Sequence, residues 1–202
     1  ALCATLLQAW IRPADPGPFL SGDRKAIELA AFIEATWREL GQPCPEHVIE
    51  VALAYAADRR KAFDPDRAVL AHGDAHPGNL LVAGSQGKRR TFKFVDPEGL
   101  FVEPAYDLSA VMREWGAELL AGDPLELGLR RCHLVARRTE LAPEPIWQWG
   151  FIERVSTGLH LRQLGWDELS REYLAVAEAW AAPQGHAPHR SASRGWPDRS
   201  SG

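Results

Sequence analysis

The chain has 202 residues, of which 46% are hydrophobic and 25% are charged, values typical of a globular domain with a substantial core. Its formal net charge of −4 lacks the basic excess of nucleic-acid-binding domains, so we expect no nucleic-acid partner. No apolar run approaches the roughly 18 residues that a membrane-spanning helix needs. The three cysteines, Cys3, Cys44 and Cys132, form no CxxC pair, which favours a cytoplasmic protein without a disulfide framework.

Helical periodicity dominates the two ends of the chain, and prolines and glycines separate the helical segments. Near the middle the pattern changes to short strand-like runs, and a polar, glycine-containing turn at 84–90 predicts a β-hairpin. The predicted helices cover residues 1–11, 23–41, 45–61, 105–120, 124–141, 145–163 and 167–182, and the predicted strands cover 67–71, 79–83 and 91–95.

The last segment differs in composition from the rest. Residues 183–202 are rich in Pro, Gly, Ser and Arg and hold one large apolar residue, Trp196. Such a segment buries too little surface to offset its ordering entropy, so we expect a disordered tail. Residues 1–182 are expected to form one unit of the α+β class, mostly helical, with a small central β-hairpin region.

The most informative stretch is VLAHGDAHPGNLL, residues 69–81, which places polar residues on a loop between two apolar strands. Asp74 and Asn79 lie five positions apart, the interval found in the kinase catalytic loop H-R-D-x-x-x-x-N. The hairpin then delivers Asp96 to the end of a strand, with Gly99 three positions later, in the place of the kinase DFG motif.

Phosphoryl transfer explains why these residue types occur in this order. Mg²⁺ prefers hard oxygen ligands, which the carboxylate of Asp96 and the amide of Asn79 would supply. Asp74 would face an acceptor hydroxyl, orient it and accept its proton during transfer. The pattern therefore predicts a magnesium-dependent phosphotransferase.

HGDAHPGN at 72–79, followed by FVDPEGLFVEPAYDLS at 94–109, resembles the aminoglycoside phosphotransferase family and, within it, the streptomycin and hydroxyurea phosphotransferase branch. The resemblance implies a protein-kinase-like fold, in which a small N-terminal lobe binds ATP and a largely helical C-terminal lobe holds the catalytic loop and the drug. It also implies an ATP-dependent enzyme that phosphorylates a hydroxyl of a small molecule, an aminoglycoside-type antibiotic.

The resemblance also assigns roles to individual residues. It implies that Asp74 is the catalytic base, that Asn79 and Asp96 bind Mg²⁺, and that His72 and Asp107 support the catalytic loop.

Two departures from the family pattern stand out. The chain has no glycine-rich strand-loop-strand and no ATP-contacting lysine on a strand, so it resembles the C-terminal lobe alone, and we expect these residues by themselves to be inactive. Val102 and Glu103 stand where the family has Gly-Asp before Pro-Ala-Tyr-Asp.

Other interpretations of the same residues stay open. Glu98, Glu103 and Glu114 could form an acidic lip for a cationic drug, or they could be solvated surface charges. His72, Asp74 and His76 form an HxDxH pattern that could bind zinc in a metallohydrolase. A truncated, non-catalytic kinase-like lobe is a further alternative.

Overall fold

A computed structural model describes residues 1–86 and 89–182, so the tail expected at 183–202 lies outside the described residues. The helices are α1 (Leu2–Ala9), α2 (Gly22–Glu39), α3 (Glu46–Ala62), α4 (Ser109–Arg113), α5 (Gly116–Leu120), α6 (Pro124–Thr139), α7 (Pro143–Gln163) and α8 (Asp167–Ala181). The strands are β1 (Leu20–Ser21), β2 (Val69–Ala71), β3 (Leu80–Gln86), β4 (Arg89–Phe94) and β5 (Leu100–Val102), and the 3-10 turns are η1 (Pro77–Asn79) and η2 (Pro104–Leu108). The predicted α+β class, mostly helical, is confirmed.

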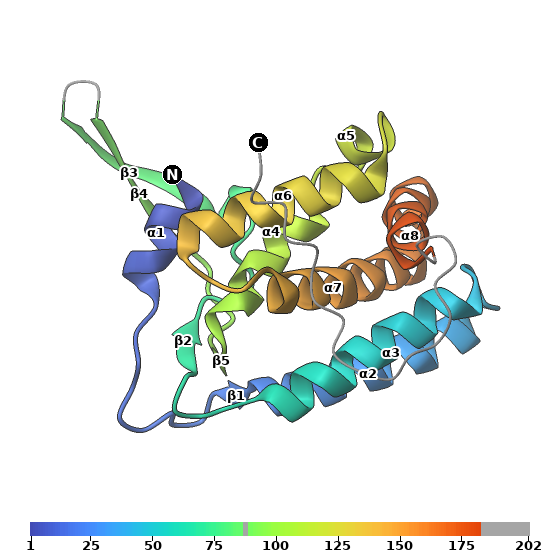
Figure 1. The fold of residues 1–202 in the computed structure, drawn as a ribbon, viewed down its shortest axis with the longest axis horizontal. Coiled ribbons are helices and arrows are strands. Elements are labelled where there is room, and N and C mark those ends of the chain that lie inside the picture. Colours follow the sequence, from blue (N-terminus) through green and yellow to red (C-terminus); the bar gives the residue numbers. More distant parts are fainter. Residues whose placement is uncertain (87–88, 183–202) are drawn as a thin grey trace, which may run out of the picture.

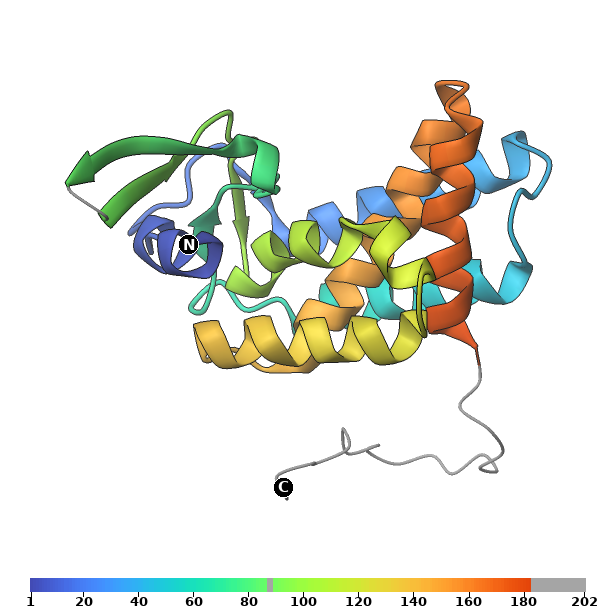
Figure 2. The same ribbon diagram turned by 90° about the horizontal axis from the view of Figure 1, so that it is seen from above.

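Helix α7 is the centre of the helical body, with α2, α3, α4, α6 and α8 packed around it (Figures 1 and 2). It begins at Pro143, because proline suits the first turn of a helix, where its missing N–H has no partner to lose. It is buried on nearly all sides, and Phe151, Ile152 and Val155 are fully buried. Trp147 and Trp149 are both buried in this core as well.

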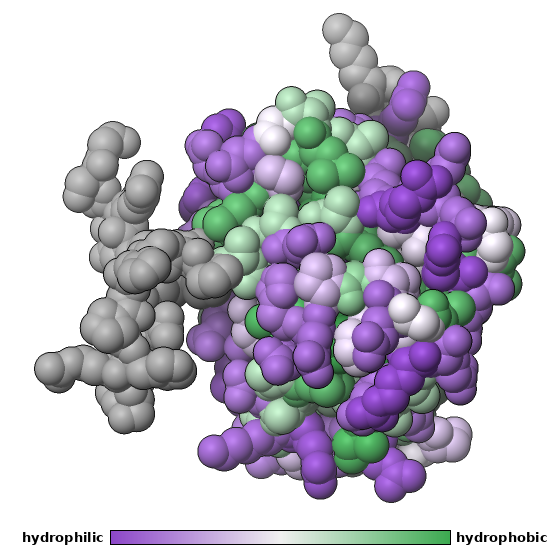
Figure 3. Space-filling model, turned by 90° about the vertical axis from the view of Figure 1, so that its right-hand side faces the viewer, coloured by the Kyte–Doolittle hydropathy of each residue, from purple (hydrophilic) through white to green (hydrophobic). Residues whose placement is uncertain are grey.

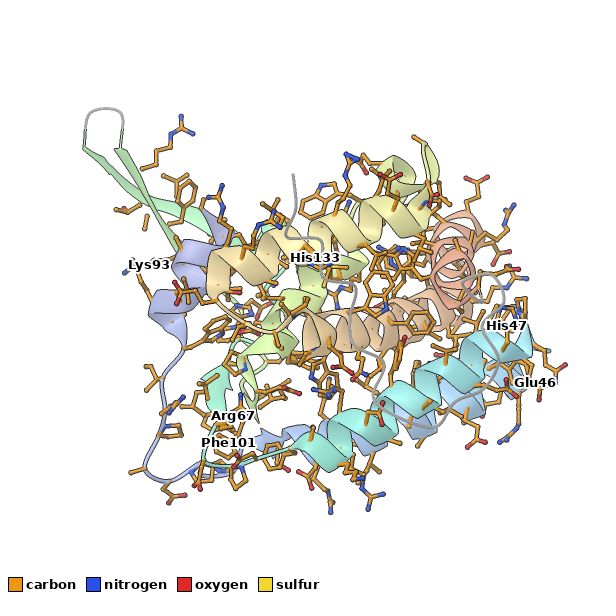
Figure 4. The ribbon with its side chains drawn as sticks, viewed as in Figure 1. Glu46, His47, Arg67, Lys93, Phe101 and His133 are labelled. Atoms are coloured by element: carbon orange, nitrogen blue, oxygen red, sulfur yellow. The ribbon has the colours of Figure 1, made fainter. Side chains whose placement is uncertain are left out.

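A small three-stranded sheet lies beside the helices in the order β1-β5-β2. Strand β5 runs parallel to β1 and antiparallel to β2, with Phe101 opposite Leu70. Figure 4 marks the position of this sheet by two labelled residues, Phe101 in β5 and Arg67, which lies shortly before β2. Because β2 ends at Ala71, the sheet fixes the point from which the following loop starts.

The predicted hairpin forms from β3 and β4, with Leu80 opposite Phe94, and it projects from the body of the molecule (Figures 1 and 2). Lys93 of β4 lies on this side, whereas Glu46 and His47 mark the opposite end of the molecule, where α3 begins (Figure 4). At the base of the hairpin the Val95 N–H donates to the Asn79 carbonyl at 2.9 Å.

The single helix predicted at 105–120 is wrong, because the segment divides into η2, α4 and α5. Pro104 opens the 3-10 turn, and Trp115 takes the left-handed conformation with φ 55° and ψ 48°. Glu114 before it is already extended, with φ −79° and ψ 169°, so α4 ends at Arg113 and α5 starts anew after Trp115.

The surface at the α8 end mixes hydrophobic and hydrophilic residues (Figure 3). Across residues 1–86 and 89–182, no helix has the length and apolar character that a membrane crossing would require. Cys44 and Cys132 are buried, Cys3 is half-buried, and all three are free thiols.

Candidate active site

The loop of residues 72–79 joins β2 to β3 and carries three of the predicted functional residues, His72, Asp74 and Asn79. Its second residue, Gly73, has φ +90°, and a Cβ there would lie 2.9 Å from the Cβ of Glu98. Both the backbone conformation and the lack of space require glycine at this position. The loop can therefore pass close against the segment that leads from β4 to β5.

Asp107, in η2, binds the backbone at the start of this loop. Its Oδ2 accepts hydrogen bonds from the His72 N–H at 2.9 Å and from Trp10 Nε1 at 2.8 Å, and its Oδ1 accepts one from the Gly73 N–H at 2.8 Å. The residue is only 1% exposed. Burial raises the pKa of Asp107 above its ordinary value, although the three hydrogen bonds act in the opposite direction.

The His72 ring connects the loop to the hairpin. Its Nδ1 accepts from the Asp74 N–H at 3.2 Å, so Nε2 carries the proton and donates to the Val95 carbonyl at 2.9 Å. The ring also packs against Phe94, with centroids 5.1 Å apart. Both ring nitrogens are therefore engaged in holding the backbone.

Asn79 contacts Asp74 directly. Its Nδ2 donates to the Asp74 carbonyl at 3.0 Å and to the Asp74 Oδ2 at 3.3 Å. Asp96 directly follows Val95, whose N–H bonds to the Asn79 carbonyl and whose own carbonyl bonds to His72. The hairpin base thus sets the exposed Asp96, with φ +58°, beside the residues that hold Asp74.

Arg113, at the end of α4, is a site residue that the sequence analysis missed. Its Nη2 donates to the Asp74 Oδ1, its Nη1 to the Glu153 Oε2 at 3.3 Å, and its Nε lies 3.7 Å from the Glu114 Oε1. Burial lowers the pKa of Arg113, but Glu153 and Asp74 more than offset this, and the pKa lies above its ordinary value. Arg113 therefore stays a cation and fixes one oxygen of Asp74.

The three glutamates considered for an acidic lip each have a different basic neighbour. Glu98, with a side chain 53% exposed, lies 3.7 Å from the Lys25 Nζ. Glu114 pairs with Arg113, as described above.

Glu103 is held more firmly than the other two. It accepts from Arg59 Nη1 at 3.2 Å and from Trp149 Nε1 at 2.8 Å. These contacts tie it to α3 and α7.

The HxDxH zinc alternative finds no support in the geometry. The ring nitrogens of His72 are both engaged, and the Nδ1 of His76 accepts from the Gly78 N–H at 3.1 Å. In the part of the chain that the structure describes, no three His, Cys, Asp or Glu side chains gather in a way that could hold a metal ion.

Comparisons with known proteins give one kind of match. Residues 6–128, more than half of the chain, match the model of the phosphotransferase enzyme family (APH). The matched segment contains the loop, the hairpin, Asp107 and Arg113. No curated protein and no solved structure gives a significant match.

Proposed function

Because the chain belongs to the phosphotransferase enzyme family, we propose that it acts in the ATP-dependent phosphorylation of a hydroxyl on a small molecule. Asp74 is the catalytic base in this proposal, and Asn79 and Asp96 hold Mg²⁺. His72 and Asp107 support the loop that carries the base.

The observation that carries this proposal is that both oxygens of the Asp74 carboxylate are oriented by other side chains. Arg113 donates to Oδ1 and Asn79 to Oδ2, on a loop whose first two N–H groups are bound by Asp107. Catalysis of phosphoryl transfer depends mainly on positioning and electrostatics, and a base must be held in place before the acceptor arrives. A merely solvated aspartate would not need this support.

The chemistry of the available donors fits a magnesium ion. Asp96 offers an exposed carboxylate and Asn79 an amide oxygen, and both are hard ligands of the kind that Mg²⁺ binds together with phosphates and water. When bound, Mg²⁺ would neutralise charge on the nucleotide phosphates. Asn79 contacts Asp74 through its Nδ2, so the same side chain would link the base to the ion.

The proton of the acceptor hydroxyl would pass to Asp74 as the oxygen bonds to phosphorus. Arg113 holds the Asp74 carboxylate in place beforehand, because its Nη2 donates to the Asp74 Oδ1. Arg113 therefore keeps the base ready without itself receiving a proton.

For the acceptor, we propose an aminoglycoside-type antibiotic, as expected of a kinase from the streptomycin and hydroxyurea phosphotransferase branch. For the protein, we propose a cytoplasmic location. The support is the FVDPEGLFVEPAYDLS segment, together with the exposed carboxylate of Glu98 and the partly exposed one of Glu114 as candidate contacts for a cationic compound. We further propose that residues 1–182 correspond to the C-terminal lobe of a kinase-like protein, so that groups outside them complete the nucleotide site.

The test uses the full-length protein, ATP with Mg²⁺, and a panel of streptomycin-like, hydroxyurea-like and unrelated hydroxyl acceptors. We expect Asp74→Asn to lower kcat by about 10²–10⁴-fold, the range typical of a lost general base, with little change in the KM for ATP. Glu126→Gln, which neutralises an exposed carboxylate on α6, is the matched control. Undiminished turnover by Asp74→Asn would reject the proposed role of Asp74.

A further inference from the structure

We propose that the adjacent α7 residues Glu153 and Arg154 are positioning residues that hold Arg113 against the carboxylate of Asp74. The inference rests on the proposed function, and it adds a part of the machinery that lies in another helix, beyond the stretch matched by the family model.

Glu153 fixes the side chain of Arg113. Its carboxylate is buried, Oε1 accepts from the Tyr106 hydroxyl, and Oε2 accepts from Arg113 Nη1 at 3.3 Å. The other terminal nitrogen of the same guanidinium donates to Asp74. Both oxygens of Glu153 therefore accept hydrogen bonds, and Arg113 contacts Glu153 through one terminal nitrogen and Asp74 through the other.

Arg154 fixes the backbone around Arg113. Its Nη2 donates to the Met112 carbonyl at 2.7 Å and to the Glu114 carbonyl at 3.2 Å, the residues on either side of Arg113. Arg131 adds a donor to the Glu114 carbonyl at 2.7 Å. Carbonyls at the C-terminal end of a helix lack intrahelical partners, and a cation there also interacts favourably with the helix dipole.

The environment of Arg154 indicates that packing alone does not explain it. The residue is 0% exposed, and its guanidinium lies 4.9 Å from the Trp180 ring centre and 5.2 Å from that of Tyr173. Within the described part of the chain its Nε and Nη1 have no hydrogen-bond partner. A buried cation with two unpaired nitrogens is costly, and an apolar residue of similar size would avoid that cost.

The packing of α7 against α4 explains how Glu153 reaches the side chain of Arg113 while Arg154 reaches the backbone beside it. Gly150 lies against α4 so closely that an added Cβ would be 2.4 Å from the Met112 Cβ. Positions 150, 153 and 154 are spaced i, i+3 and i+4, so they share one face of the helix. The close approach at Gly150 therefore brings the end of α4 within reach of Glu153 and Arg154.

Loss of either residue should affect the base without affecting nucleotide binding. Glu153→Gln keeps the size of the side chain, but it removes the charge and gives Arg113 an amide that can present a donor. Arg113 would then be free to leave Asp74 part of the time. A positioning defect of this kind lowers kcat and leaves the KM for ATP unchanged, because neither Glu153 nor Arg154 is proposed to touch the nucleotide.

The experiment compares wild type, Glu153→Gln, Tyr106→Phe and Arg154→Lys in the full-length protein. Glu144→Gln, an exposed glutamate on the same helix, serves as the control. Turnover is measured together with the ¹⁵N NMR signals of the Arg113 guanidinium, which are assigned with Arg113→Lys. The NMR reports whether that side chain is held rigidly.

We expect Glu153→Gln and Arg154→Lys to lower kcat at least about tenfold while the KM for ATP stays unchanged. The separate NMR signals of the Arg113 guanidinium should merge into averaged signals, because the side chain would then move between orientations. Tyr106→Phe should give the same changes to a smaller degree, and it decides the question if Glu153→Gln fails to fold. Unchanged Arg113 signals in the folded variants, or an equal effect in Glu144→Gln, would overturn the inference. If wild type phosphorylates nothing, the proposed function fails, but the NMR still decides whether Glu153 and Arg154 hold Arg113.

Discussion

Asp107 shows how one buried carboxylate organises a loop more than thirty positions away in the sequence. We predict that Asp107→Asn destabilises the protein by about 3 kcal/mol, because an amide group would face N–H donors and leave at least one of them unpaired. Trp10→Phe removes a single donor and should cost about 1 kcal/mol. Urea unfolding followed by circular dichroism measures both values, and a cost for Asp107→Asn within about 0.5 kcal/mol of zero would contradict the prediction.

The residues of the site differ in how visible they are in the sequence. Asp74, Asn79 and Asp96 lie in one short stretch with kinase-like spacing, so a motif can indicate them. Arg113 reaches Asp74 across 39 positions and Glu153 across 40, and no local motif records such a contact. The available signal was that Glu153 and Arg154 stand between the apolar pair Phe151-Ile152 and Val155, because buried charges need partners.

At the scale of elements, the contact between α4 and α7 decides where Arg113 lies. We predict that Gly150→Ala destabilises the protein by about 1–3 kcal/mol and lowers turnover, because the new methyl group would force α4 away from α7. Gly158→Ala on the same helix is the comparison, since its Cβ would crowd α8 instead of α4, 3.0 Å from the Leu174 Cγ and 3.1 Å from the Tyr173 Cβ. Thermal unfolding and kcat are the measurements. Equal effects of the two substitutions would show that the α4 contact has no special role.

The elements that the sequence predicted share a physical property. Helices α3, α6 and α7 begin at or directly after prolines, and the β3–β4 hairpin has two apolar runs around a polar turn. Strands β1 and β5 are two and three residues long, too short for any period, and their pairing comes from distant segments. The break at Trp115 was equally hidden, because a left-handed tryptophan has no signature in a single sequence.

At the scale of the whole molecule, the buried thiols contribute to how stability changes at alkaline pH. Burial raises the pKa of Cys44 to about 11 and that of Cys132 to about 12, from an ordinary value of 9.0. Above pH 9 the thiols ionise in the unfolded chain but not in the folded one, which favours unfolding. The contribution of these thiols is therefore complete below pH 9 and is lost as the pH rises towards 11 and 12.

We accordingly expect the free energy of unfolding to decrease steadily between pH 9 and pH 10.5, measured by urea titration at fixed ionic strength. Cys132→Ala removes one of the titrating thiols. The difference in the free energy of unfolding between wild type and this variant should therefore become smaller over the same pH range. A difference that stays constant with pH would show that Cys132 ionises equally in both states.

The fold class and the family of the whole molecule could be predicted from its sequence. Its place in one branch of the family and its assignment to one lobe are not tested by the structure. Periodicity predicted the mostly helical α+β fold, and the motifs predicted the phosphotransferase family, and both are confirmed. The streptomycin and hydroxyurea branch, and the assignment of residues 1–182 to a C-terminal lobe, stay predictions. Substrate choice depends on side chains around the loop, and these are not part of the kinase-like spacing.

Trp10 and the His72 amide bind the same oxygen of Asp107. The indole proton of Trp10 is consequently an internal reporter on the loop, because any shift of His72 changes the charge density that this proton meets. A ligand bound over Asp74 would therefore change the NMR signal of Trp10, the residue that directly follows α1. Titrating nucleotide or acceptor while observing that one resonance would follow the site without an added label.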